Sequence, residues 1–338
     1  MLQTLNDNPD YTPAIAARTA PVYERVKSVI SEAAWPYFAP DVDEVLRLKR
    51  ERNAVILAHN YMTPDIYHCV SDIGGDSLAL AQRAMDVEAD VIVLCGVHFM
   101  AETAKLLNPE KTVIIPDPAA GCSLAESISG ADIRKMRRLY PGVPVVTYVN
   151  TSAEVKAESD VCCTSANAKL VVESLGVDRV MLLPDEYLAR NVAAVTDVEI
   201  ITFPGRCEVH ETFTADQVVA LRRAHPDVTV LAHPECAPEV LQEVDYAGST
   251  SGMADYVRDH QPPEVALITE CSMSDNLIST NPRTRFIRSC SLCPHMQRIT
   301  MENIAEALRE MKFEVTINAS IASKARRAVE NMLKVGRG

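Results

Sequence analysis

Three copies of one plan, about 86 residues apart, constrain the fold of this chain more than any other feature of its sequence. Each copy has an apolar strand with polar residues at its end, a turn of small polar residues, a further apolar strand and then a cysteine. The turns are GGDSLALA at 74–81, CTSANAKL at 163–170 and GSTSGMAD at 248–255. A period of this length is too long for a solenoid and is typical of small α/β domains related by pseudo-threefold symmetry.

The strands of this plan are short apolar runs, most of them rich in β-branched residues. They span 54–58, 91–95, 112–116, 143–149, 179–183, 199–203, 229–232, 264–269 and 284–287. Segments with helical spacing lie between most of them, and one begins with a capping box, Thr214-x-x-Gln217. Apolar strands that alternate with helices indicate parallel sheets covered on both faces. The sequence therefore predicts an α/β protein of three similar three-layer αβα domains, arranged in pseudo-threefold symmetry around a central active site.

The expected domain boundaries follow from this plan. Before the repeat, prolines interrupt the first forty residues, so we expect helices only at 22–34 and 41–51 in this part of the chain. The predicted division is an N-terminal arm at 1–40, a first domain at 41–110 plus 312–338, a second at 111–198 and a third at 199–311.

The charge balance excludes several classes of protein. The 338 residues include 33 basic and 46 acidic side chains, a net charge of −13, so a nucleic-acid or anionic-membrane partner is not expected. No uncharged apolar run approaches the roughly 20 residues of a membrane-spanning helix, and the first residues lack the pattern of a secretion signal. These features predict a cytoplasmic protein.

Ten cysteines are many for such a protein, and three of them mark the repeat. Cys122, Cys207 and Cys293 recur at intervals of 85 and 86 residues, each in the turn after an apolar strand. The default interpretation of six others is that of small buried apolar residues: Cys69, Cys95, Cys162, Cys163, Cys236 and Cys271. The tenth, Cys290, forms a C-x-x-C pair with Cys293 and is a candidate redox partner for it.

Three thiolates that meet at the centre of three domains would surround a soft metal. A closed zinc site needs a fourth protein ligand, which His210 or Cys290 could supply. A cubane iron–sulfur cluster with only three thiolates keeps one iron open, and that iron can act as a Lewis acid in a dehydration. The alternative, three unrelated core cysteines, stays open at this level.

Polar side chains at the strand ends are candidates for catalysis and binding. They are His59, Asn60 and Tyr61, then Tyr148 and Asn150, then His233 and Glu235, with His210 three residues after Cys207. Tyr61, Tyr148 and Glu235 are spaced by 87 residues, which we take as the register of the copies. Hydroxyl residues follow in the turns: Ser77, Ser165, Ser249 and Thr250. They either cap helices or bind anionic groups at helix N-termini.

Eight motifs, in this order along the chain, resemble those of quinolinate synthases: AHNY, GDSLALA, TYVN, TSANA, GRCEVH, AHPEC, GSTSGM and CPHM. The resemblance covers about residues 45–335. It implies three α/β domains around a [4Fe–4S] cluster held by three cysteines. It also implies condensation of iminoaspartate (iminosuccinate) with dihydroxyacetone phosphate to quinolinate, phosphate and two waters, in NAD biosynthesis. L-aspartate oxidase would be the source of iminoaspartate.

The resemblance also implies roles for individual residues. The cluster ligands would be Cys122, Cys207 and Cys293. The catalytic residues would be Tyr61, His210, His233 and Glu235, with Tyr61 an acid/base and Glu235 a proton acceptor. The substrate-binding residues would be His59, Ser77, Tyr148, Val149, Asn150, Ser165, His233, Pro234, Glu235, Ser249 and Thr250.

Two alternatives differ in class from this enzyme. A non-catalytic iron–sulfur or zinc protein that senses redox state or metal would need the ligands but not the polar strand ends. A nucleotide-binding dehydrogenase is disfavoured, because no G-x-G-x-x-G follows any predicted strand.

Overall fold

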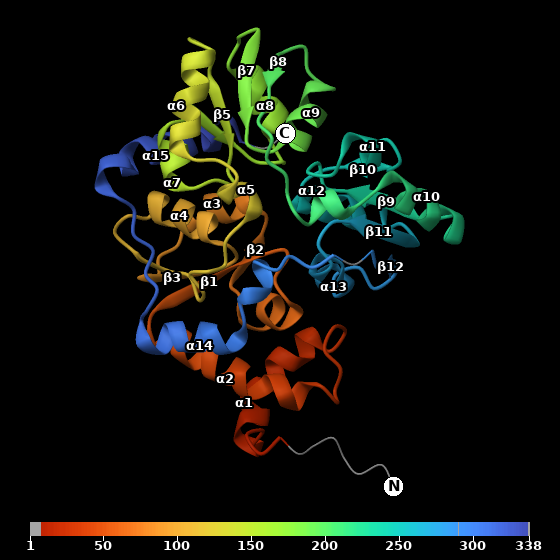
Figure 1. The fold of residues 1–338 in the computed structure, drawn as a ribbon. Coiled ribbons are helices and arrows are strands. Elements are labelled where there is room, and N and C mark those ends of the chain that lie inside the picture. Colours follow the sequence, from red (N-terminus) through yellow and green to blue (C-terminus); the bar gives the residue numbers. More distant parts are fainter. Residues whose placement is uncertain (1–7, 290, 337–338) are drawn as a thin grey trace.

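Three four-stranded parallel sheets form the framework of the molecule (Figure 1). The computed structural model describes residues 8–289 and 291–336. The sheets have the orders β2-β1-β3-β4, β6-β5-β7-β8 and β10-β9-β11-β12. Their strands are β1 Ala54–His59, β2 Ile73–Gly75, β3 Val91–Cys95, β4 Thr112–Ile114, β5 Val145–Tyr148, β6 Val161–Cys163, β7 Arg179–Leu183, β8 Glu199–Ile201, β9 Thr229–Ala232, β10 Tyr246–Ala247, β11 Glu264–Ile268 and β12 Arg285–Ile287. Each sheet therefore repeats one strand order, and the α/β prediction is confirmed.

Helices connect and cover these strands, as parallel pairing requires. The α-helices are α1 Pro13–Val26, α2 Trp35–Glu51, α3 Ser77–Met85, α4 His98–Leu107, α5 Ser123–Glu126, α6 Gly130–Leu139, α7 Ala153–Ala157, α8 Ala168–Ser174, α9 Glu186–Ala193, α10 Ala215–Ala224, α11 Pro238–Leu241, α12 Thr250–His260, α13 Ser272–Ile278, α14 Met301–Glu310 and α15 Ala319–Val335. Three short turns of other helix types are η1 Asp65–Val70, η2 His210–Thr212 and η3 Met296–Arg298. No helix of the described residues is long and apolar enough to cross a membrane.

In each sheet one aspartate makes the same hydrogen bond to a strand, so the three copies share this contact. Asp72, Asp160 and Asp245 accept hydrogen bonds from backbone N–H groups of β1, β5 and β9, at 2.7–2.8 Å. Each also pairs with a basic side chain: Lys49, Arg137 and Arg222, all at 2.8 Å. The three copies of the sequence plan therefore share hydrogen bonds as well as strand order. Their rotational relation stays a prediction.

The register of the copies differs from the predicted one. Ala58, Thr147 and Ala232 hold the same place in their sheets, since they pair with the last residues of β3, β7 and β11. His59, Tyr148 and His233 therefore correspond, and so do Tyr61, Asn150 and Glu235. The equal spacing of Tyr61, Tyr148 and Glu235 is a coincidence, because the connections between copies differ in length.

The two ends of the described chain pack against other parts of the molecule. The N-terminal helices are α1 and α2, so the helices predicted at 22–34 and 41–51 begin at the wrong residues; position 40 lies inside α2. Pro13 and Pro36 lie in the first turns of these helices, where proline is tolerated. In Figure 1 α14 lies beside α2 and α15 beside α7, contacts that join distant parts of the chain. The division into an arm and three domains stays a prediction.

Candidate functional site

All three repeat cysteines line one cavity of about 80 Å³. Its wall also includes ten of the other predicted site residues: His59, Tyr61, Ser77, Tyr148, Asn150, Ser165, His210, His233, Glu235 and Thr250. Val149, Pro234 and Ser249, which were also predicted to bind substrate, are not part of this wall. Side chains from the carboxyl ends of three sheets therefore meet in one place, which is where α/β proteins bind their ligands.

The starts of helices α3 and α12 place the hydroxyl residues Ser77 and Thr250 at the cavity. Asp76 and Ser249 are the N-caps of α3 and α12, and their side chains accept from backbone N–H groups inside the first turn. Ser77 and Thr250, one residue further on, line the cavity, and so does Asp76. Ser249 caps α12, its hydroxyl lies 3.3 Å from the carboxylate of Asp76, and the substrate-binding role predicted for it stays a prediction.

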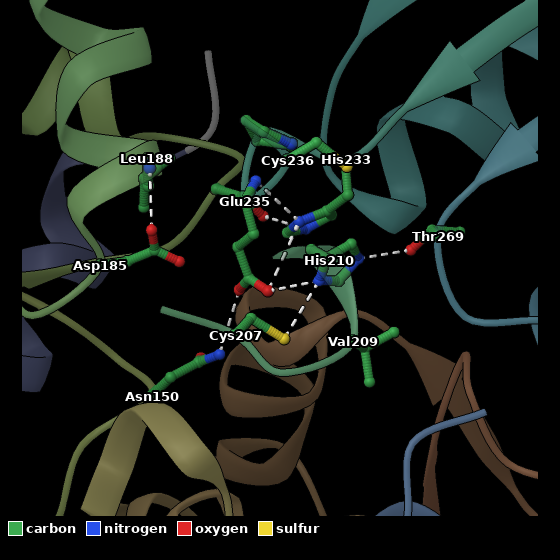
Figure 2. Close-up of polar contacts among 12 residues, drawn as sticks. Asn150, Asp185, Leu188, Cys207, Val209, His210, His233, Glu235, Cys236 and Thr269 are labelled. Atoms are coloured by element: carbon green, nitrogen blue, oxygen red, sulfur yellow. Dashed lines mark hydrogen bonds and ion pairs between the residues drawn. The ribbon is translucent and has the colours of Figure 1, made fainter. Parts of the chain in front are cut away.

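Glu235 lies at the centre of the polar network (Figure 2). Its Oε1 accepts from the Tyr148 hydroxyl at 2.5 Å and from the Asn150 amide at 3.3 Å, and its Oε2 lies 2.8 Å from His210 Nδ1. The side chain is only about 4% exposed. Burial alone raises the pKa of a carboxyl, but the His233 and His210 rings and the Tyr148 hydroxyl outweigh it and lower the pKa of Glu235. Glu235 is therefore ionised and able to accept a proton.

A chain of hydrogen bonds joins Tyr61 to this carboxylate. The Tyr61 hydroxyl lies 2.5 Å from Thr269 Oγ1, which lies 2.9 Å from His210 Nε2. Because ionised Glu235 can only accept, His210 carries its hydrogen on Nδ1 and accepts on Nε2. Every hydrogen of the chain then points toward Glu235, so the chain is oriented as a path for proton transfer between Tyr61 and Glu235.

Two buried histidines correspond in register and make the same backbone contact. His59 Nδ1 accepts from the Tyr61 N–H at 3.2 Å, and His233 Nδ1 accepts from the Glu235 N–H at 3.3 Å. Burial lowers the pKa of His59 to about 4 and that of His233 to about 3. Both rings are therefore neutral at physiological pH, with the hydrogen on Nε2. The Nε2 of His233 lies 3.1 Å from the Ser165 hydroxyl.

The three cysteine-bearing turns are held to the sheets in the same way. The carbonyls of Ala120, Gly205 and Ser291, each two residues before a repeat cysteine, accept from backbone N–H groups of His98, Glu186 and Cys271 at 2.7–3.1 Å. Those donors follow β3, β7 and β11 at equivalent positions. The common attachment explains why three cysteines far apart in sequence reach one cavity.

Backbone N–H groups of the second and third residues after each repeat cysteine lower the pKa of its thiol and so partly oppose the effect of burial. The donors are Leu124 and Ala125 for Cys122, Val209 and His210 for Cys207, and His295 and Met296 for Cys293. N–H groups aimed at sulfur stabilise a thiolate and are among the features that tune iron–sulfur clusters. The buried cysteines Cys69, Cys95, Cys162 and Cys163 receive no such pair.

This donor set fits a cluster bound by three cysteines. Burial raises the pKa of Cys122 to about 12 and of Cys293 to about 11, and it also raises the pKa of Cys207, so without a metal all three are protonated at neutral pH. A bound metal would displace these protons. Cys207 also forms a second donor group with His210 and Glu235, whose ligand atoms lie within 4.8 Å of one another. Hydrogen bonding through His210 Nδ1 accounts for that closeness, since it contacts both partners.

Two predictions about other cysteines have different outcomes. Cys271 is disulfide-bonded, so it is not the free buried thiol that the sequence suggested. Cys290 lies outside the described residues, and the redox role predicted for it stays a prediction. The other five cysteines assigned to the interior are free and buried: Cys69, Cys95, Cys162, Cys163 and Cys236.

Sequence reasoning missed several side chains that complete the site. Thr269 is the most important, because it links Tyr61 to His210. Its position directly after β11, among the other polar strand ends, was the available signal. Phe99 and Met100 of α4 supply apolar wall, and His295, between Cys293 and η3, lines the cavity with its Nε2 2.9 Å from Glu208.

A parallel-sheet fold with thiols, a buried carboxylate and neutral histidines in one cavity has the features of an enzyme active site that can hold a metal cluster. A family model described as quinolinate synthetase A protein matches residues 43–334. The chain is 65% identical to quinolinate synthase 2 of Mesorhizobium japonicum, over 93% of this chain and 97% of that protein. It is also 65% identical to a quinolinate synthase of Agrobacterium fabrum, over 94% and 92%, and 64% identical to one of Xylella fastidiosa, over 90% of each chain. The chain belongs to the quinolinate synthase family.

Proposed function

We propose that this protein condenses iminoaspartate with dihydroxyacetone phosphate to form quinolinate, phosphate and two waters, as a step of NAD biosynthesis. The observation that carries the proposal is the cavity itself, in which three equivalent cysteine turns meet an ionised Glu235 and a proton path from Tyr61. The reaction balances, since the atoms of the two substrates equal those of quinolinate, phosphate and two waters.

The hydroxyl and imidazole donors suit substrates with carboxylates. Ser77 and Thr250 lie in the first turns of α3 and α12, where backbone N–H groups and the helix dipole favour anions. The neutral His59 ring has an Nε2 hydrogen to donate. No lysine or arginine is among the cavity-lining residues that the structure describes, so these neutral donors would hold the substrate charges.

Tyr61 and Glu235 would carry out the proton transfers. Burial raises the pKa of Tyr61 well above its usual value, so its hydroxyl would pass a proton along Thr269 and His210 to Glu235 only as it gains another from substrate. Tyr61 could then take a proton from substrate while Glu235 becomes protonated, and the reverse movement would return a proton to a departing hydroxyl. Condensation, ring closure and two dehydrations all need such paired transfers.

Cys122, Cys207 and Cys293 would hold a [4Fe–4S] cluster, which when bound supplies a Lewis-acidic iron for a substrate hydroxyl or carboxylate. The chain's own contribution is to aim two N–H groups at each sulfur and to keep the sulfurs on separate turns. A source of iminoaspartate must accompany the enzyme, and an oxidase that acts on aspartate, such as L-aspartate oxidase, has the required chemistry.

The test is product formation by protein purified without oxygen. Quinolinate should appear only when iminoaspartate and dihydroxyacetone phosphate are both present, with one phosphate released per quinolinate. Cluster-containing protein that forms no quinolinate from this pair would contradict the proposal and favour a metal- or redox-sensing role.

A further inference from the structure

The three loops that carry Tyr61, Asn150 and Glu235 share an unusual backbone feature. Each loop has four residues, of which Tyr61, Asn150 or Glu235 is the third. The backbone carbonyls of the second and fourth residues both accept a hydrogen bond from one side-chain nitrogen. The loops span 59–62, 148–151 and 233–236, at corresponding positions: the first two begin at the last residue of β1 and of β5, and the third begins directly after β9. The three nitrogens belong to Asn276, Lys156 and Asn191, none of which lines the cavity.

Asn276 and Asn191 hold the first and third loops. Asn276 of α13 donates its amide to the carbonyls of Asn60 and Met62, at 3.0 and 2.8 Å. Asn191 of α9 donates to the carbonyls of Pro234 and Cys236, at 2.9 and 3.0 Å. Each asparagine lies eight residues after the last paired residue of its strand, so the two occupy equivalent positions on helices of neighbouring sheets. One side chain therefore fixes both sides of Tyr61, and another fixes both sides of Glu235.

The second loop has the same contact from a different residue. The position on α4 that corresponds to Asn191 and Asn276 is Thr103, whose hydroxyl instead bonds to the carbonyl of Phe99 at 2.8 Å. Lys156 of α7 takes its place: its ammonium donates to the carbonyl of Val149 at 2.8 Å and to that of Thr151. Its nitrogen also lies 5.4 Å from the centre of the Phe99 ring.

Burying a lysine is expensive unless its hydrogens are bound, and Lys156 is fully buried. No carboxylate of the described residues lies within ion-pair distance of it, and burial lowers the pKa of Lys156. The two backbone carbonyls and the Phe99 ring stabilise the ammonium at short range, and Glu102 favours the charged form from further away. A fold that needed only an apolar filler here would be better served by leucine or methionine. That a lysine is buried here despite this cost indicates that it is needed to hold the 148–151 loop in its conformation.

We infer that Asn191, Asn276 and Lys156 are positioning residues that hold Glu235, Tyr61 and Asn150 in their reactive geometry by bridging the carbonyls on either side of each. The inference rests on the proposed function for its activity readout and on the contacts alone for its structural readout. Two of the three bridges join different sheets, Asn276 from the third to the first and Asn191 from the second to the third. The site geometry therefore depends on the packing between neighbouring sheets.

The test compares Asn191→Leu, Asn276→Leu and Lys156→Met with the control Asn108→Leu. Asn108 is also a buried amide that donates to a carbonyl, that of Ala104 at 3.1 Å, but it lies outside the cavity wall. All four are made in the full chain purified without oxygen, and thermal melting shows that each is folded. We expect kcat/KM to fall by about 10- to 100-fold in the three bridge variants and by less than about twofold in the control. In Asn191→Leu the loss should lie mainly in kcat, because Glu235 is the proton acceptor.

Hydrogen exchange provides a readout that is independent of turnover. Amide exchange should accelerate in 233–236 for Asn191→Leu, in 59–62 for Asn276→Leu and in 148–151 for Lys156→Met, with the other two loops unchanged in each case. Unchanged exchange in the loop that a variant should release, or an activity loss in Asn108→Leu equal to that of the bridge variants, would overturn the inference. A wild-type protein that forms no quinolinate would refute the proposed function alone, since the exchange comparison would still stand.

Discussion

At the scale of single residues, Glu235 is buried and yet has a lowered pKa, because the His233 and His210 rings and the Tyr148 hydroxyl stabilise its anion. Such a carboxylate is stable as an anion and a weak base in isolation. It could act in proton transfer because the hydrogen-bond chain from Tyr61 through Thr269 and His210 ends at its carboxylate. In the proposed mechanism Tyr61 would contact substrate and Glu235 would hold the proton, so the two roles would fall to different residues.

We expect Glu235→Gln to keep the cluster and to lower turnover by about 100-fold or more, because an amide cannot take up the proton that the chain delivers. The measurements are iron content and quinolinate formation. Glu239→Gln, on the exposed surface of α11, is the matched control and should keep full activity. A Glu235→Gln protein that lacks iron would show that the residue holds the site together rather than accepting protons.

The neutral histidines make stability depend on pH. His59 has a pKa of about 4 when folded and about 6.5 when unfolded, so its contribution is present above 6.5 and is lost as the pH falls toward 4. The wild-type free energy of unfolding should fall by about 1 kcal/mol between about pH 7 and about pH 5.5 on account of this ring. Urea unfolding of His59→Gln should show a shallower pH dependence, whereas His260→Gln, at an exposed position, should keep the wild-type one. Equal slopes in all three proteins would count against a buried neutral ring.

At the scale of elements, the same local devices recur in each copy. Capping boxes begin α6, α10 and α14 at Ser129, Thr214 and Thr300, each seven residues after a repeat cysteine. The cap fixes where the helix starts, and this in turn fixes the length of the turn that holds the cysteine.

Thr214→Ala should lower the free energy of unfolding by about 1 kcal/mol, because the Gln217 N–H loses its acceptor. Gln217→Ala removes only the reciprocal bond to the Thr214 N–H and should cost less. Urea titration measures both, and kcat should not change in either variant. A Thr214→Ala protein as stable as the wild type would mean that the cap is not needed to start α10.

Most of the strands could be predicted from the sequence, and the features that were missed have physical causes. All nine predicted strands exist, because their apolar runs are continuous. The edge strands β2, β6 and β10 were missed, since two or three residues such as Ile73–Gly75 carry no periodicity. The predicted register was wrong because the connections between copies differ in length, so equal spacing in sequence did not identify the residues that correspond in the sheets. The hydrogen bonds of Asn191 and Asn276 were not predicted, because they depend on packing between sheets, which a local sequence pattern does not show.

At the scale of the whole molecule, three sheets of one strand order place their carboxyl ends at one cavity, and helices from distant parts of the chain close the assembly (Figure 1). Each sheet contributes a polar loop, each cysteine comes from a turn held by the same backbone bond, and neighbouring sheets bridge each other's loops. No single sheet contains the site. The repeat brings three cysteines and three polar loops to one cavity.

The most direct test is the iron and sulfide content of anaerobically purified wild type, Cys293→Ala and Cys95→Ala, measured with their visible absorption. Cys95 is also a free cysteine and is fully buried, but it does not line the cavity. We expect about four iron and four sulfide per chain in wild type and in Cys95→Ala, and their loss in Cys293→Ala. Wild-type protein that contains zinc or no metal, or a Cys293→Ala protein that keeps the full cluster, would contradict this expectation.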